Sequence, residues 1–206
     1  MTHKIICYGD SNTYGACGFV GGRHAADSRW TGILHDSGLY EVVNLGENGR
    51  EIPSDRWEFN ELADFLRQEP DFDLLTIMLG TNDLLTMVRS GSAKVAVRME
   101  QFLTELLNTQ PNVCRTEQIL LIAPPSTVLG KMAPSSAALD EACRELGDYY
   151  ADIAVFMGKL REYVKANFKE ESQRRYILKT AAAEAFAEER VLTQKEIEEI
   201  IRQGPK

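Results

Sequence analysis

The sequence predicts an α/β protein in which a parallel sheet carries helices on both faces. Three observations lead to this fold class: four short apolar runs bounded by turn residues, helical periodicity between the runs, and polar or glycine-rich loops at the ends of three runs. Alternation of strands with helices favours parallel pairing, because each helix returns the chain to the end of the sheet where the next strand begins.

The four expected strands cover residues 4–8, 40–45, 73–79 and 118–123. The third run, Asp-Leu-Leu-Thr-Ile-Met-Leu, is apolar enough to be a central strand that is buried on both faces. Apolar residues recur at helical spacing between the runs and after the last one. These patterns predict helices over residues 28–37, 53–68, 92–107 and 135–154.

The character of the chain changes after residue 154, where a fifth strand would be expected and is apparently absent. Helical periodicity continues to residue 168, a charged helix is expected over 169–190, and Thr193 with Glu196 forms a capping box that opens a last helix. We therefore expect an α/β domain over 1–154 and a helical extension over 155–206. The apolar stripe of this extension should cover the bare sheet edge or a partner subunit, and the second case would give a homodimer through the C-terminal helices.

The bulk composition excludes several classes of protein. A length of 206 residues suits one domain with an appendage. The formal net charge of −8 supplies no basic stripe for nucleic acid, and no apolar run is long enough to span a bilayer. No signal-peptide pattern opens the chain, and the four cysteines are widely spaced without a CxxC pair. We expect free thiols, a cytoplasmic protein, and neither a metal site nor a cofactor.

Polar loops follow three of the expected strands. Gly9-Asp10-Ser11-Asn12 comes directly after the first, Gly46-Glu47-Asn48-Gly49 after the second, and Gly80-Thr81-Asn82-Asp83 after the third. Ligands of open α/β sheets bind outside the carboxyl ends of the strands, so a serine in the first loop can point into that crevice. The same residue types also occur in turns for plain backbone reasons. The sequence thus predicts three loops that meet at one edge of the sheet.

Taken together, these loops resemble those of the SGNH hydrolases, the GDSL-type esterases and acylhydrolases. The resemblance covers residues 4–154, and Gly-Asp-Ser after a first strand combined with Gly-Thr-Asn-Asp after a third is its most specific part. Asn12 stands where the GDSL form has leucine, and Arg29-Trp30-Thr31-Gly32 is also familiar from bacterial members. The resemblance implies a flavodoxin-like three-layer α/β/α sandwich and the hydrolysis of small esters or acyl groups.

The resemblance also implies roles for three residues. Ser11 would be the nucleophile, and the N–H of Ser11, the N–H of Gly49 and the side-chain amide of Asn82 would form the oxyanion hole. A glycine suits this place because the missing Cβ lets backbone and ligand approach closely. The alternative for Asn82 is a turn cap after the strand. Asp10 and Asp83 are expected to brace their loops as hydrogen-bond acceptors.

The chain departs from the family in its last block, an Asp-x-x-His whose histidine takes the serine proton. The only histidines are His3, His24 and His35, so that block is missing. His3 should lie at the opposite end of the first strand and His35 on the first helix, which leaves His24 as the one that could swing near Ser11. A solvated loop histidine is the alternative. Two hypotheses follow: a weak hydrolase, or a non-catalytic relative that binds a carboxylate, ester or acetylated sugar.

Overall fold

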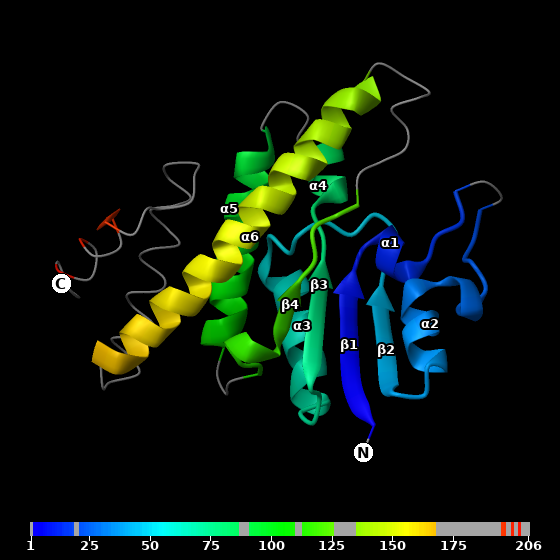
Figure 1. The fold of residues 1–206 in the computed structure, drawn as a ribbon, viewed down its shortest axis with the longest axis horizontal. Helices are drawn as coiled ribbons and strands as arrows, with labels where there is room; N and C mark the ends of the chain where they lie inside the picture. The colour runs from blue at the N-terminus through cyan, green and yellow to red at the C-terminus, as the bar shows by residue number, and fades with distance from the viewer. Residues whose placement is uncertain are drawn as a thin grey trace.

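Four parallel strands form a single sheet in the order β2-β1-β3-β4 (Figure 1). The strands are β1 (His3–Gly9), β2 (Tyr40–Gly46), β3 (Leu74–Met78) and β4 (Ile119–Leu121). The computed structural model describes residues 2–18, 21–86, 91–109, 113–125 and 135–167, with residues 195, 196, 199 and 202. The parallel four-stranded sheet predicted from the sequence is confirmed, and no fifth strand occurs within these ranges.

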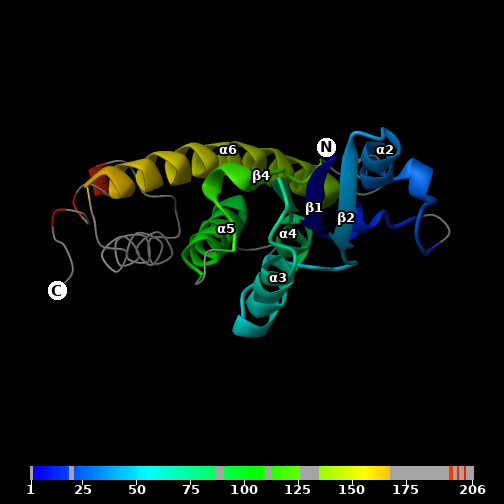
Figure 2. The same cartoon turned by 90° about the horizontal axis from the view of Figure 1, so that it is seen from below.

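Helices cover both faces of the sheet. The longer ones are α2 (Trp30–Asp36), α3 (Arg56–Gln68), α5 (Gly91–Asn108) and α6 (Ser135–Asn167). Figure 2 shows α2 and α6 on one side of the strands and α3 on the other. Two short helices, α1 (Ser11–Tyr14) and α4 (Thr81–Thr86), open at the ends of β1 and β3, and two 3-10 turns are η1 (Ala26–Ser28) and η2 (Thr116–Gln118). The arrangement is the predicted α/β sandwich.

Strand β1 lies between β2 and β3, and its pairing with both shows how the ends of the three strands are aligned. Tyr8 pairs with Leu45 on one side and Ile77 on the other, and Gly9 is level with residues 46 and 78. The three strands therefore end together, so the loops that follow them leave from one edge of the sheet.

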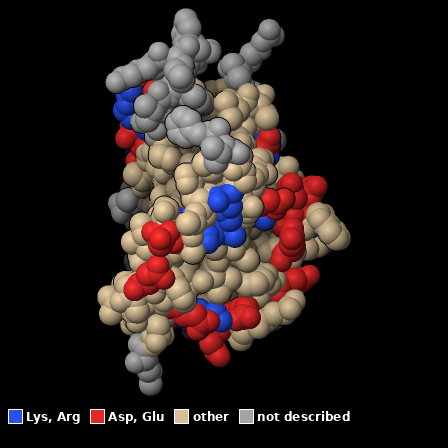
Figure 3. Space-filling model, turned by 90° about the vertical axis from the view of Figure 1, so that its right-hand side faces the viewer, with Lys and Arg blue, Asp and Glu red and all other residues tan. Residues whose placement is uncertain are grey.

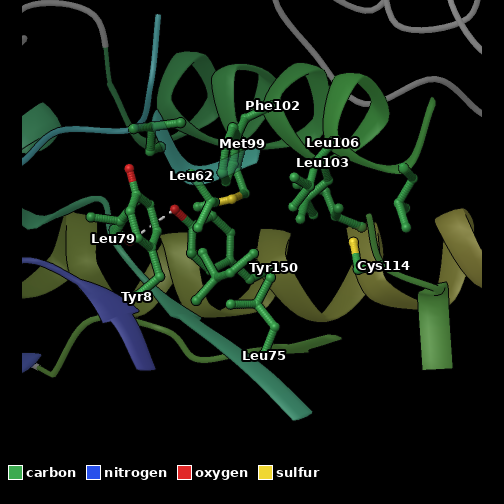
Figure 4. Packing of buried hydrophobic residues seen from close by; sticks show 14 of the residues in the cluster. Tyr8, Leu62, Leu75, Leu79, Met99, Phe102, Leu103, Leu106, Cys114 and Tyr150 are labelled. Carbon is green, nitrogen blue, oxygen red and sulfur yellow. Dashed lines mark hydrogen bonds between the residues drawn. The ribbon is translucent and has the colours of Figure 1, made fainter. Parts of the chain in front are cut away.

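The main hydrophobic core joins the sheet to α3, α5 and α6 (Figure 4). The ring of Tyr8 stacks on Phe102 of α5 with a centroid separation of 6.3 Å, and Leu62 of α3 and Met99 of α5 belong to the same cluster. Large aromatic and aliphatic side chains bury the most apolar surface, which favours the folded state most strongly here.

Helix α6 joins the helix predicted over 135–154 and its predicted continuation to residue 168 in one element. It runs without a break across residue 154, packs against α5 and α4, and lies on the β4 side of the sheet in both ribbon views. Its residues Cys143, Leu146, Tyr150 and Ile153 complete the core. No helix of the described ranges is both long and apolar enough to cross a membrane.

The extension predicted for 155–206 is only partly within the described residues. The predicted continuation to residue 168 corresponds to the second half of α6. The helix predicted over 169–190 lies outside the described residues, whereas residues 195, 196, 199 and 202 are helical, as expected from the capping box at Thr193. The proposal that this extension covers the sheet edge or a second subunit stays a prediction.

Acidic side chains outnumber basic ones on the face that α2 occupies. Figure 3 shows acidic groups along the margins of this face and a small cluster of basic groups between them. The distribution agrees with the formal net charge of −8. Among the described residues, this face has no extended basic surface of the kind that neutralises nucleic-acid phosphates.

Glu100 on α5 is a buried carboxyl group with an incomplete set of partners. The residue is 1% exposed, and its Oε2 atom accepts no hydrogen bond among the described residues. Burial raises the pKa of Glu100 from 4.5 to about 7. Between pH 4.5 and about pH 7, Glu100 keeps its proton in the folded state and loses it in the unfolded state. The free energy of unfolding therefore falls as the pH rises through this range.

Replacement of Glu100 by glutamine is expected to stabilise the protein at pH 8 by about 3 kcal/mol and to change little at pH 5. Glutamine stays neutral, so the variant avoids a buried charge that the wild type acquires above pH 7. Urea unfolding at the two pH values measures the effect. Glu61→Gln, at an exposed position of α3, is the matched control. An equal difference from wild type at pH 5 and pH 8 would contradict the assignment.

Candidate active site

Hydrogen bonds connect the three loops at the carboxyl edge of the sheet. The N–H of Asp10 donates to the carbonyl of Met78 at 3.3 Å, which joins the first loop to β3. The N–H of Glu47 donates to the carbonyl of Gly9 at 3.1 Å, which joins the second loop to the first. The structure thus brings together the three loops that the sequence singled out.

Ser11 is the first residue of α1, immediately after the end of β1. The side chain of Asp10 caps this helix, because its Oδ1 accepts the N–H of Asn12 at 2.8 Å and the Asn12 Nδ2 at 3.0 Å. Gly15 ends the helix in a left-handed conformation with φ of +83°. Ser11 is half-buried in this capped turn.

Asn44 connects β2 to α1 and α2. Its Nδ2 donates to the carbonyl of Thr13 at 2.7 Å and to the Thr31 Oγ1 at 2.8 Å. Its Oδ1 accepts the N–H of Gly46 at 2.9 Å. Asn44 begins the stretch 44–49 that is similar to the second block of the SGNH hydrolases, but the sequence predicted no separate role for it, although a polar residue inside an apolar strand is a signal for one.

Gly49 lies in the loop after β2 with φ of +79°, a conformation that L side chains rarely adopt. A Cβ built on Gly49 would meet no atom within 4 Å, so the space beside it is open. The backbone angle therefore explains the glycine. The close approach of a ligand to Gly49, expected from the sequence, stays a prediction.

Arg50, the next residue, ties this loop to the end of β1. Its Nη1 donates to the carbonyls of Gly9, at 3.1 Å, and Leu45, and its Nη2 pairs with Glu47 Oε2 at 2.7 Å. The guanidinium also lies over the Tyr8 ring, 4.4 Å from the centroid. Sequence reasoning missed Arg50, and its position beside Gly49 was the only signal.

Asn82, in the first turn of α4, points its amide toward the loop after β2. Its Nδ2 donates to the carbonyl of Arg50 at 2.9 Å, beside Gly49. A carboxamide carries two N–H donors, so this bond leaves the second donor for a ligand. The bond joins α4 to the loop after β2, and the oxyanion role of Asn82 stays a prediction.

Gly80 joins β3 to α4 in a space that admits no side chain. Its φ is +120°, and a Cβ would lie 2.7 Å from Leu146 Cδ2 and 2.8 Å from the Tyr150 hydroxyl. That hydroxyl donates to the carbonyl of Leu79 at 3.0 Å, as the dashed line in Figure 4 shows. Helix α6 therefore supports the turn that presents Asn82.

The two aspartates of the loops are fully buried and act as hydrogen-bond acceptors, as their expected bracing role requires. Burial raises the pKa of Asp10, and the hydrogen bonds from Asn12 oppose this shift. Burial also raises the pKa of Asp83 to about 6, while the positive charge of Arg98 opposes it. Asp83 accepts the N–H of Ile52, which belongs to the loop after β2.

The three histidines lie at different places. His3, at the start of β1, has its Nδ1 3.4 Å from Asp73 Oδ2, at the opposite end of the strand from Ser11. His35 lies in the last turn of α2. The N–H of the exposed His24 donates to the carbonyl of Gly15 at 2.8 Å, so its backbone lies beside the end of α1. Among the described residues, no cluster of histidine, cysteine, aspartate or glutamate could hold a metal ion.

The fold and these loops define a class of protein: an α/β protein with a polar site at the carboxyl edge of a parallel sheet. The chain belongs to the GDSL-like lipase/acylhydrolase family, whose model matches residues 7–173. The family resemblance drawn from the three loops is thereby confirmed, and with it membership of a group of ester hydrolases.

Solved structures show the same fold. The chain is similar to a carbohydrate acetylesterase family member from Sinorhizobium meliloti, with 27% identity and a TM-score of 0.61 over 76% of this chain and 80% of that one. It is also similar to the aryl esterase of M. smegmatis, with 26% identity and a TM-score of 0.61 over 76% of this chain and 81% of that one. No curated protein sequence matches the chain.

Proposed function

We propose that this protein hydrolyses small esters or acyl groups with Ser11 as the nucleophile. The observation that carries the proposal is the bond from the Asn82 amide to the carbonyl of Arg50, which links the asparagine to the Gly49 loop at the edge where Ser11 begins α1. The Ser11 N–H, the Gly49 N–H and the second Asn82 donor would stabilise the oxyanion. Acetyl esters are the first substrates to test, because the similar solved structures are named acetylesterase and aryl esterase.

The reaction would proceed in two steps. The Ser11 oxygen attacks the carbonyl carbon, the bond to the alcohol oxygen breaks, and the alcohol leaves with the proton that Ser11 gave up. Water then attacks the acyl-serine and releases the carboxylic acid. Both steps need an acceptor for a proton, because serine is a weak nucleophile at its own pKa.

Covalent labelling tests the nucleophile directly. Treatment of the full-length protein with a fluorophosphonate is expected to add one adduct, which peptide mass spectrometry should place on Ser11. Hydrolysis of p-nitrophenyl acetate by the same preparation tests turnover. Absence of both the adduct and turnover would contradict the proposal and favour the second hypothesis, in which the pocket only binds a carboxylate or ester.

The proton acceptor can be assigned with one variant. His24 is the only histidine whose backbone contacts the α1 end of the site. If His24→Ala removes the Ser11-dependent rate, His24 is the base. If the rate is unchanged, His24 is not the base. The Ser11-dependent rate is the wild-type rate minus that of Ser11→Ala.

Replacement of Asn82 by alanine is expected to lower kcat about 100-fold with little change in KM. A donor aimed at the developing oxyanion acts mainly in the transition state, so its loss reduces kcat. Steady-state kinetics with p-nitrophenyl acetate measures the effect. Asn60→Ala, at an exposed position of α3, is the control and should keep the wild-type rate. A KM increase without a fall in kcat would show that Asn82 only binds substrate.

A further inference from the structure

Asp83 joins α4 to the loop that follows β2. Its carboxylate is 0% exposed and accepts the N–H of Ile52 at 3.1 Å on Oδ2 and 3.3 Å on Oδ1. Ile52 is also 0% exposed and lies three residues after Gly49. The hydrogen bonds between Asp83 and Ile52 therefore connect the helix that carries Asn82 to the loop that carries Gly49.

Arg98 of α5 completes the connection from the other side. Its Nη1 lies 2.9 Å from Asp83 Oδ1, and its Nη2 donates to the carbonyl of Ile52 at 3.0 Å. Nη1 also donates to Glu51 Oε2 at 3.4 Å. Both main-chain groups of Ile52 are thus bound, the N–H by Asp83 and the carbonyl by Arg98.

A buried ion pair is a weak source of stability, because desolvation of the two charges offsets their attraction. A fully hydrogen-bonded buried network does restrict geometry, because movement of any member would leave a buried polar group without its partner. Here the restricted geometry is that of the loop carrying Gly49 relative to the helix carrying Asn82. This placement matters for catalysis, because moving a catalytic group by about 1 Å can lower the reaction rate about 100-fold.

We infer that Asp83 and Arg98 are positioning residues, which hold the Gly49 amide and the Asn82 amide at the spacing that one oxyanion requires. The inference rests on the proposed function, since it assigns the pair to the same oxyanion hole. Neither side chain has to touch the substrate. Their action is on the relative position of two loops that do.

Steady-state kinetics of Asp83→Asn, Arg98→Met and Arg98→Lys in the full-length protein tests this role. Asp83→Asn and Arg98→Met should each lower the Ser11-dependent kcat about tenfold with KM within about twofold, and Arg98→Lys should recover part of the loss because it keeps a charged donor. Arg67→Lys is the matched control, because Arg67 forms an exposed pair with Asp64 on α3. Thermal unfolding measures the folded fraction of each variant, and each rate is divided by the concentration of folded protein.

Two outcomes separate the inference from the function on which it rests. If wild type and Ser11→Ala hydrolyse the ester equally, the proposed function and the inference are both wrong. If the wild type has a Ser11-dependent rate and the Arg98 and Asp83 variants lower the melting temperature without changing kcat, only the inference is wrong. Faster hydrogen exchange at the Ile52 amide in Arg98→Met, together with the loss of kcat, is the result that supports it.

Discussion

Replacement of Ser11 by alanine is expected to lower kcat/KM for p-nitrophenyl acetate about 1000-fold. The hydroxyl is the proposed nucleophile, so its loss removes the acyl-serine pathway and leaves only attack by water. The assay compares wild type with Ser11→Ala, and Ser54→Ala, at an exposed position before α3, serves as the control. Equal rates for wild type and Ser11→Ala would eliminate serine catalysis.

The size of this loss also reports on the missing histidine block. In serine hydrolases the nucleophile and its base act as a unit, so removing the serine from an enzyme that already lacks a base changes little. A large loss in Ser11→Ala therefore means that a proton acceptor acts within reach of Ser11. A small loss, with hydrolysis still dependent on Asn82, would mean that the oxyanion donors accelerate attack by water alone.

Replacement of Gly46 by alanine is expected to reduce the free energy of unfolding by about 3 kcal/mol, the upper range for overpacking. A Cβ at this position would lie 2.1 Å from the Tyr14 nitrogen and 2.5 Å from the Thr13 carbonyl carbon. Both are backbone atoms of α1, so no side-chain rotation can relieve the contact. The variant must separate β2 from α1, which carries Ser11, and we expect it to lose activity as well as stability.

Urea unfolding of Gly46→Ala beside Gly18→Ala measures this effect. A Cβ on Gly18 would meet no atom within 4 Å, so that variant controls for the general effect of replacing a loop glycine. Equal unfolding free energies for the two variants would show that β2 and α1 do not contact as closely as the structure indicates.

The strands and long helices could be predicted because periodicity is a local property of the sequence. The run 73–79 contains β3, and the helix expected over 92–107 agrees with α5 within one residue at each end. The helix α1 has only four residues, which is close to a single turn and too short to show any periodicity. The same holds for α4, with six residues. Both were therefore interpreted as loops.

The positions of the candidate site loops followed from the parallel sheet, but the contacts between the loops did not. Asn82 bonds to Arg50, 32 residues away, and Arg98 binds Ile52, 46 residues away. No short-range pattern encodes such pairs, because they arise only when α4, α5 and the loop after β2 pack together. Arg98 was also hidden within an amphipathic helix, where a charged residue is normally assigned to solvent.

The hydrogen bond between Tyr150 and Leu79 connects the end of β3 to a helix that continues far along the chain. Helix α6 extends 17 residues beyond Tyr150, and its residues Leu146 and Tyr150 lie close against Gly80. A small rotation of α6 about its packing on α5 would therefore displace the turn before Asn82. Another molecule or an engineered fusion bound at the distant end of this helix would then shift the candidate site as well.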